Sequence, residues 1–246
     1  MKLFDLFLFF IIALLFLHIR KHRYSSSDME VLIFEGDKKE KLEIMCDFKQ
    51  PIFFQINPEK ENLIEKCNYD SIEKIGGTGN VFDHSFIHEQ GLGSFFESDF
   101  LRPSLNRFEK QYTDYSIYLG GASGSTEDDS KIDRFSYDIS HRQYLLATQG
   151  SILVTLVPPK HASIFKTDYH DMKFEYGEVE DIKTLPVTLK VGDCLFIPAL
   201  WGYKISFLEK GSYTQFRYKS LMNILSYADY YVLHFLQKLN TKYRFS

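Results

Sequence analysis

The chain has 246 residues, of which 44% are hydrophobic, and its formal net charge is −4. This length suits one large domain or two small ones, and the composition excludes both a disordered tail and a polytopic membrane protein. Basic residues form no stripe apart from the short run at residues 20–23, so no nucleic-acid partner is predicted.

The first segment in chain order is strongly apolar. Residues 3–19 read LFDLFLFFIIALLFLHI, and no polar residue interrupts residues 6–17. Seventeen helical residues reach roughly 25 Å, close to the hydrocarbon thickness of a bilayer. A cleaved signal peptide and a buried core helix are the alternatives, but there is no small-x-small cleavage site after Leu17 and no polar face. We therefore predict a single-pass transmembrane anchor over residues 1–23 that contacts membrane lipid through residues 3–19.

Charges beside this segment predict its orientation. Arg20, Lys21 and Arg23 follow it, whereas Lys2 and the amino terminus are partly offset by Asp5. The positive-inside rule then places the globular domain on the cytosolic side of the membrane. Residues 24–30, rich in serine, are predicted to be a spacer between the anchor and the domain.

Residues 31–219 show no second boundary and are predicted to form one domain. Its first part mixes short apolar runs with helical stretches, and its second part consists of short strands separated by turns. The strand candidates are residues 115–119, 144–148, 151–157, 185–190, 194–197, 204–208 and 213–219. Strands at this spacing favour an all-β barrel or sandwich.

The remaining residues, 220–246, are predicted to form a C-terminal helix. Apolar residues recur there at helical intervals, namely Leu221, Leu225, Ala228, Val232, Phe235, Leu236 and Leu239. Such a helix either covers one end of the barrel, which is the simpler interpretation, or pairs with its copy in a homodimer.

Several motifs resemble those of one protein family. Residues 192–205, GDCLFIPALWGYKI, resemble the Gly-Asp-x-x-(apolar)-Ile-Pro-x-x-Trp-x-His motif of JmjC-like cupins. Weaker matches at residues 50–54, 118–126, 149–150 and 156–159 follow the family's order. The resemblance spans roughly residues 49–219. It implies a mainly β fold, a cupin-type double-stranded β-helix (a jelly-roll barrel) with flanking helices, related to Fe(II)/2-oxoglutarate oxygenases.

The resemblance also implies where a metal site would lie. In such enzymes a His-x-Asp/Glu pair and a distal His hold iron, a face that leaves open positions for oxygen chemistry. With Trp201 as the anchor of the register, the distal His position falls on Tyr203. The pair falls either on Tyr137 and Ile139 or, one residue earlier, on Ser136 and Asp138. Both imidazoles are replaced in either register, so neither a metal nor a catalytic residue is predicted.

The resemblance further implies a pocket beside the former metal site. A lysine that often binds the cosubstrate corresponds to Ile152, and Thr126 and Trp201 are the other predicted pocket residues. Asp138 and His141 are three residues apart, so on an extended strand they point to opposite faces and share a metal only through a bend.

Three functions are compatible with these motifs. The first is a non-catalytic, membrane-anchored cupin-like protein without a cofactor that acts in binding or structural assembly with a protein partner, as in a membrane-associated or viral structure. The second is an Fe(II)/2-oxoglutarate hydroxylase with an atypical site at Asp138 and His141. The third is a small-molecule or sugar-binding cupin that uses Trp201, Tyr203 and Tyr137. The fold alone does not decide among them.

Overall fold

We analysed a computed structural model of the chain, which describes residues 3–36, 38–56, 61–75, 80–96, 100–104, 111–121, 134–162, 166–169, 173–175 and 182–239. The helices in these residues are α1 (Leu3–Arg23), α2 (Lys39–Cys46), α3 (Glu61–Lys66), α4 (Tyr69–Lys74), α5 (His84–Glu89), α6 (Gly93–Phe96), α7 (Pro159–Ala162), α8 (Leu221–Ser226) and α9 (Ala228–Leu239). The strands are β1 (Leu32–Phe34), β2 (Ile52–Gln55), β3 (Val81–Phe82), β4 (Gln111–Gly120), β5 (Arg134–Tyr137), β6 (Arg142–Gln149), β7 (Ile152–Val157), β8 (Lys166–Asp168), β9 (Lys173–Glu175), β10 (Leu185–Leu189), β11 (Asp193–Phe196), β12 (Gly202–Phe207) and β13 (Gly211–Ser220).

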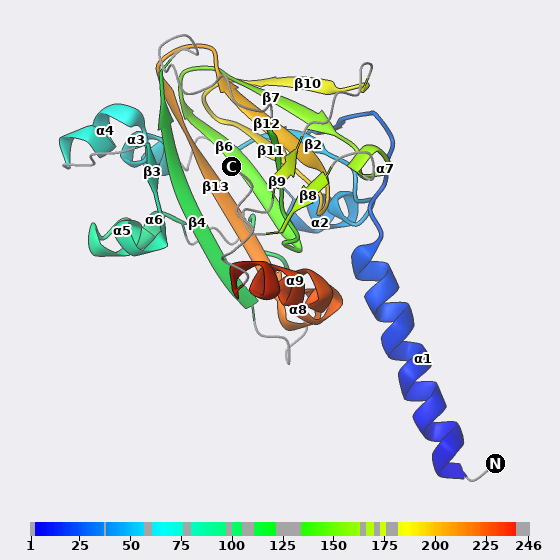
Figure 1. Cartoon of the computed structure of the whole chain (residues 1–246). Coiled ribbons are helices and arrows are strands. Elements are labelled where there is room, and N and C mark those ends of the chain that lie inside the picture. The colour runs from blue at the N-terminus through cyan, green and yellow to red at the C-terminus, as the bar shows by residue number, and fades with distance from the viewer. Residues whose placement is uncertain are drawn as a thin grey trace.

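The strands form two sheets that enclose a barrel (Figure 1). One sheet has the order β1-β2-β11-β6-β13-β4-β3, and the other has the order β10-β7-β12-β5-β9-β8. Along the chain, β4, β6, β11 and β13 belong to the first sheet, and β5, β7, β10 and β12 belong to the second. Within each group of four, neighbouring strands pair antiparallel. This alternation and strand order are those of a double-stranded β-helix, so the predicted cupin-like architecture is present.

Side chains that alternate along the strands serve two separate cores. On β13, Tyr213 faces the barrel interior, whereas Phe216 and Tyr218 face the helices outside the first sheet. The interior is filled by a cluster of buried side chains from both sheets: Leu145, Ala147, Ile152, Val154, Leu156, Leu189, Leu195, Ile197, Trp201 and Tyr213. The outer core packs the same sheet against helices α2 to α6. Because β6 is covered on both faces, it reads as a run of buried residues rather than as an alternating pattern.

The C-terminal segment forms two helices, which lie across one end of the barrel (Figure 1). Their packed face is polar and aromatic: Asn223 donates from Nδ2 to the carbonyl oxygen of Ile139 at 2.9 Å, and Tyr227 is buried. All seven apolar residues of the predicted helical repeat are exposed instead. In place of one helix over residues 220–246 the described residues form two, and the predicted apolar stripe does not face the barrel; residues 240–246 lie outside the described residues.

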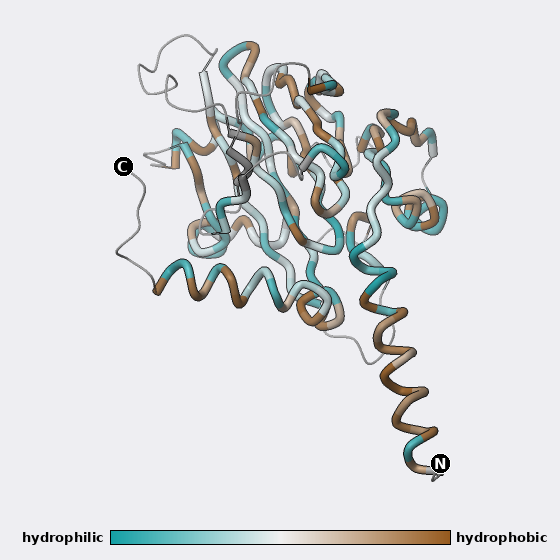
Figure 2. Tube along the Cα trace, turned by 45° about the vertical axis from the view of Figure 1, so that its right-hand side comes forward, coloured by the Kyte–Doolittle hydropathy of each residue, from teal (hydrophilic) through white to brown (hydrophobic). Residues whose placement is uncertain are grey.

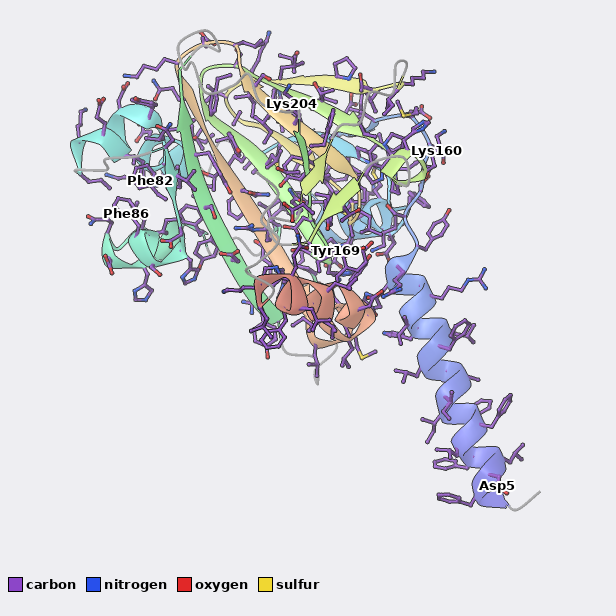
Figure 3. All side chains as sticks on the ribbon, in the orientation of Figure 1. Asp5, Phe82, Phe86, Lys160, Tyr169 and Lys204 are labelled. Atoms are coloured by element: carbon purple, nitrogen blue, oxygen red, sulfur yellow. The ribbon has the colours of Figure 1, made fainter. Side chains whose placement is uncertain are left out.

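Helix α1 leaves the barrel beside α8 and projects away from it (Figure 2). Among the described residues, no helix combines the length and apolarity needed to cross a membrane. The predicted transmembrane helix, and the single-pass localisation with a cytosolic domain that followed from it, are therefore wrong. Asp5 lies near the free end of α1 (Figure 3), and basic residues occupy its last turn. The uninterrupted apolar run at residues 6–17 is about 18 Å long, against about 30 Å of bilayer hydrocarbon.

The base of α1 and the residues after it are fixed to the domain. Arg23 donates from Nε to the carbonyl oxygen of Ser226 at 2.6 Å and forms an ion pair with Asp229. In the predicted spacer, Ser26 is buried, and its carbonyl oxygen accepts a hydrogen bond from Trp201 Nε1 at 3.0 Å. Residues 24–30 therefore include a point of attachment to the barrel.

Candidate functional site

The predicted metal-site positions lie together at the barrel end that α8 and α9 cover. Tyr203 on β12 is directly opposite Ser136 on β5, and Gly202 is opposite Tyr137. Tyr137 and Ile139 are both 3% exposed and belong to a small apolar cluster with Tyr227. The structure therefore brings these predicted positions together, and it surrounds Tyr137 and Ile139 with apolar and aromatic side chains.

The two tyrosines at these positions are neutral phenols. The Tyr203 hydroxyl oxygen accepts a hydrogen bond from Gln215 Nε2 at 3.0 Å. Loss of hydration raises the pKa of Tyr203 well above its usual value, and the negative charge of Asp138 adds to this. Burial likewise raises the pKa of Tyr137, with smaller contributions from neighbouring tyrosines and carboxylates. A neutral phenol is a poor substitute for an imidazole as an iron ligand.

The carboxylate of Asp138 is engaged by protein groups. Its Oδ1 accepts a hydrogen bond from the Ser140 amide at 2.6 Å, and its Oδ2 lies 4.0 Å from Arg217 Nη1. Arg217 also pairs with Asp114 at 2.8 Å and donates to Ser116 Oγ at 3.0 Å. In the part of the chain that the structure describes, no three His, Cys, Asp or Glu side chains are placed to hold a metal ion. The donor set at this barrel end does not fit the iron of the resembled enzymes.

The structure describes two of the three predicted pocket residues, Ile152 and Trp201, and both lie in the packed barrel interior rather than at an open site. Ile152 is fully buried in the barrel interior. Trp201 is also fully buried, and its indole Nε1 donates the hydrogen bond to the Ser26 carbonyl oxygen that holds this segment against the barrel. Thr126 lies outside the described residues. His141 faces a different environment from Asp138, because its ring is 5.5 Å from the ring of His22 on α1.

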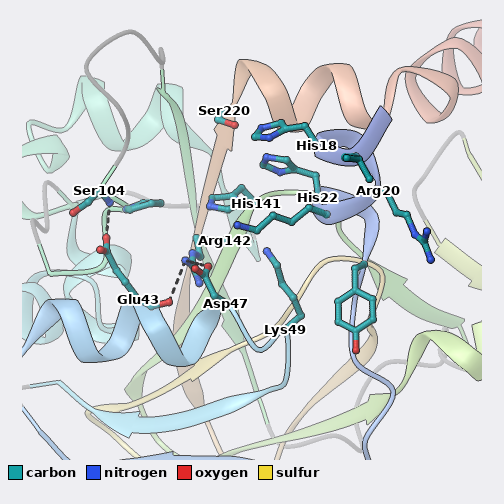
Figure 4. A pocket seen from close by; sticks show the side chains of 14 residues that line it. His18, Arg20, His22, Glu43, Asp47, Lys49, Ser104, His141, Arg142 and Ser220 are labelled. Carbon is teal, nitrogen blue, oxygen red and sulfur yellow. Dashed lines mark hydrogen bonds and ion pairs between the residues drawn. The ribbon is translucent and has the colours of Figure 1, made fainter. Parts of the chain in front are cut away.

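A cleft that sequence reasoning missed lies at the base of α1 (Figure 4). It has a volume of about 730 Å³, and we call it the α1 cleft. Its walls come from the end of α1, from α2 and the residues after it, from the start of β6 and from the end of β13. The lining residues are Leu17, His18, Arg20, Lys21, His22, Tyr24, Glu43, Asp47, Lys49, Pro103, Ser104, His141, Arg142 and Ser220.

Arg142 is the most deeply buried charge of the α1 cleft. It is 4% exposed, and its guanidinium carbon lies 5.7 Å from the centre of the Phe196 ring. Its Nη2 donates to Asp47 Oδ1 at 3.0 Å and to the Glu43 carbonyl oxygen at 3.5 Å. Its Nη1 is also buried but has no hydrogen-bond partner among the described residues.

Two more basic side chains face the same space (Figure 4). Lys49 is 9% exposed and takes a left-handed backbone conformation with φ 57°. Burial lowers the pKa of Lys49, the charge of Asp47 opposes this and the charge of Lys21 adds to it. Burial, helped by the positive charges of Lys49, His22 and Lys21, lowers the pKa of His141 to about 3. His141 is therefore neutral at pH 7, and its buried Nδ1 has no hydrogen-bond partner among the described residues.

The only sequence signal for this cleft is the basic run at residues 20–23. Among the other basic residues of the lining, only His141 and Arg142 are neighbours, and Lys49 and Arg142 are 93 positions apart in the chain. They meet because the chain after α2 and the start of β6 lie at the same end of the first sheet. A scan for local motifs does not detect such an arrangement.

No family model matches the chain. No curated protein matches it either. Among solved structures, the crystal structure of hydroquinone 1,2-dioxygenase from Sphingomonas sp. TTNP3 with 4-hydroxybenzoate bound is similar at 17% identity and a TM-score of 0.30. The similarity covers 46% of this chain and 60% of that chain, so this chain spans less than two thirds of the dioxygenase. The strand order of the two sheets, and not this similarity, assigns the cupin-like architecture.

Proposed function

We propose that this chain is a non-catalytic cupin-like protein that binds a lipid surface and acts there in assembly. Its barrel is a rigid frame, and the resemblance to JmjC-like cupins reflects the origin of that frame. The observation that carries the proposal is an exposed apolar surface at one end of the molecule, which we call the apolar end. It consists of residues 6–17 of α1 together with Leu221, Leu225, Val232, Phe235, Leu236 and Leu239.

The apolar end is large, and on α1 it extends around the whole helix. Phe9, Phe10 and Phe16 are 68%, 62% and 61% exposed, and Phe235 on α9 is 60% exposed. Monomeric proteins rarely expose contiguous apolar patches above a few hundred Å², so we expect this surface to bind a partner. A helix that is apolar all round is not covered by one face of a partner helix, whereas acyl chains can surround it. We therefore assign the apolar end to lipid rather than to a second copy of the chain.

Charges at the base of α1 suit this assignment. Arg20 and Lys21 lie within four residues of the apolar run, where they can contact anionic headgroups, whereas Arg23 is paired with Asp229. Asp5 at the other end stays at headgroup level if residues 6–17 lie within the boundary between headgroups and acyl chains. The proposal is thus for interfacial binding, in which both charged ends of α1 remain hydrated.

The barrel supports a binding role rather than oxygenase chemistry. Neutral tyrosines stand where the resembled enzymes carry iron ligands, and Asp138 is held by Arg217 and the Ser140 amide. The interior is packed with apolar side chains, including Ile152 at the cosubstrate position. These features support a frame that positions the apolar end.

A vesicle flotation assay tests the proposal with the full chain, purified in mild detergent and diluted into preformed vesicles. We expect it to float with phosphatidylcholine vesicles that contain phosphatidylserine. The variant F9S/F10S/F235S/L236S should bind at least about tenfold more weakly, because each buried apolar side chain contributes about 1.5–3 kcal/mol. The matched control I33S/V81S changes exposed apolar residues elsewhere and should bind like the parent chain.

Two results would contradict lipid binding. The first is flotation of the fourfold variant at the level of the parent chain. The second is an absence of flotation together with a stable dimer in sedimentation experiments that the fourfold variant abolishes. The second result would assign the apolar end to another copy of the chain.

A further inference from the structure

The α1 cleft contains two buried polar atoms that have no partner in the described part of the chain. Arg142 Nη1 and His141 Nδ1 are both buried, and neither has a hydrogen-bond partner among the described residues. Both residues line the α1 cleft, and His141 lies beside Lys49 and His22 in it (Figure 4). A buried polar atom without a partner destabilises the folded chain, so a ligand that accepts a hydrogen bond from Arg142 Nη1 is favoured here.

The charge of the α1 cleft favours an anion. Its deepest cations are Arg142 and Lys49, and Lys21 adds a third from α1. Its two carboxylates are engaged already: Asp47 binds Arg142, and Glu43 accepts the amide hydrogen of Ser104. Arg20 is the fourth cation of the lining, so four cations and two carboxylates leave two positive charges in excess before any histidine is protonated. The cations approach from three different elements of the fold, which suits an anion with several acceptor oxygens.

We propose that the α1 cleft binds a phosphate group, which accepts hydrogen bonds from Arg142 Nη1 and forms ion pairs with Lys49 and Lys21. His141 provides a further polar contact once the ligand is present. Arginine and lysine together are the usual protein partners of phosphate oxygens. A cleft of about 730 Å³ also has room for the alcohol to which the phosphate is esterified. The assignment of the phosphate to a lipid rests on the proposed function, but phosphate binding itself does not.

The position of the α1 cleft favours a lipid headgroup as the source. Leu17 lines the α1 cleft and is also the last residue of the apolar run on α1, where it is 59% exposed. The apolar end and the α1 cleft are therefore continuous. A lipid whose acyl chains lie along α1 would bring its phosphate to Lys21 and Lys49. A free phosphate compound would satisfy the same donors without using the apolar end.

The experiment uses the full chain and two probes. Inorganic phosphate is titrated by calorimetry at constant ionic strength, with chloride as the balancing anion so that screening does not change. Flotation is then compared for vesicles of phosphatidylcholine alone and of phosphatidylcholine with phosphatidic acid. The variant K21Q/K49Q removes two cations and keeps the buried Arg142, and K183Q/K190Q is the matched control, with two exposed lysines elsewhere. Thermal unfolding is measured for each variant to establish that it folds.

We expect at least one probe to bind the parent chain and the control equally. For a folded K21Q/K49Q variant, that binding should weaken roughly tenfold or more, as expected for the loss of charge-assisted contacts. If the chain binds vesicles with phosphatidic acid more tightly than inorganic phosphate, the ligand is a lipid headgroup. If it binds inorganic phosphate more tightly, the ligand is a free phosphate compound. If K21Q/K49Q does not fold, the single variant K21Q, on an exposed side chain, replaces it, with a smaller loss expected.

The proposal is overturned if neither probe binds the parent chain. It is equally overturned if the folded K21Q/K49Q variant binds both probes as the control does. Its failure is distinct from failure of the proposed function. Vesicle binding that depends on the apolar end but not on Lys21 and Lys49 refutes the phosphate site alone. Binding of inorganic phosphate without any vesicle binding refutes lipid binding and keeps the site.

Discussion

Lowering the pH from 7 to 5 is expected to destabilise the folded chain through one buried side chain of the α1 cleft, His141. Burial, with the positive charges of Lys49, His22 and Lys21 nearby, lowers the pKa of His141 from 6.5 to about 3. The folded chain therefore keeps His141 neutral at pH 5, whereas the unfolded chain protonates it below pH 6.5. Because the unfolded state binds more protons in this window, the free energy of unfolding falls as the pH falls.

The expected size of the effect follows from those two pKa values. The contribution of His141 is complete above pH 6.5 and is lost progressively as the pH falls toward 3. Between pH 7 and pH 5 the loss is about 2 kcal/mol, which is 1.36 kcal/mol for each pH unit below 6.5. This is a substantial part of the 5–15 kcal/mol of stability that is typical of a folded domain, about 0.05–0.15 kcal/mol per residue.

Urea unfolding followed by tryptophan fluorescence measures this loss, because Trp201 is the single tryptophan of the chain and is fully buried. The parent chain and the exposed-site control H88N should both lose stability between pH 7 and pH 5. The variant H141N should lose about 2 kcal/mol less than they do. The carboxylates of Glu43 and Asp47 also line the α1 cleft, and both residues are the same in all three proteins. An identical pH dependence in H141N and the parent chain would refute the reasoning.

Three further outcomes are expected from two glycine positions, from Trp201 and from the donor set at the former metal position. Gly150 and Gly91 have φ +70° and +69°, but only at Gly150 would an added Cβ lie 2.7 Å from a carbonyl oxygen, that of Lys210. Chemical denaturation should show that G91A loses about 1–2 kcal/mol and that G150A loses clearly more. W201F should lower the unfolding free energy by about 1–3 kcal/mol and speed proteolysis near Ser26, because the indole hydrogen bond is lost. Calorimetry with 2-oxoglutarate and Fe(II), added anaerobically, should give no saturable binding, and one equivalent bound per chain would restore the oxygenase hypothesis.

Local patterns in the sequence determined the identity of most elements in the second half of the chain. The Gly-Asp turn before β11, the apolar alternation of β12 and the spacing of the turns all depend on residues close in sequence. Strand and helix periodicities are properties of neighbours two to four positions apart, so they can be read without the fold. The positions at residues 136–139 and 203 came from the resemblance to JmjC-like cupins instead, and no strand was predicted over residues 134–137, where the structure has β5 opposite β12.

Only the tertiary structure decided which surfaces are covered and which charges meet. The helical repeat at residues 221–239 marks an apolar face, but a repeat does not state whether that face packs inward, and here Tyr227 and Asn223 pack instead. The length of the segment at residues 3–19 suggested a membrane span, although charged groups at both ends shorten its apolar run. The α1 cleft joins Lys49, Arg142 and the end of α1 across long stretches of chain. Pairing between distant strands, rather than any local pattern, places those cations together, because strand order is set by the packing of the whole barrel.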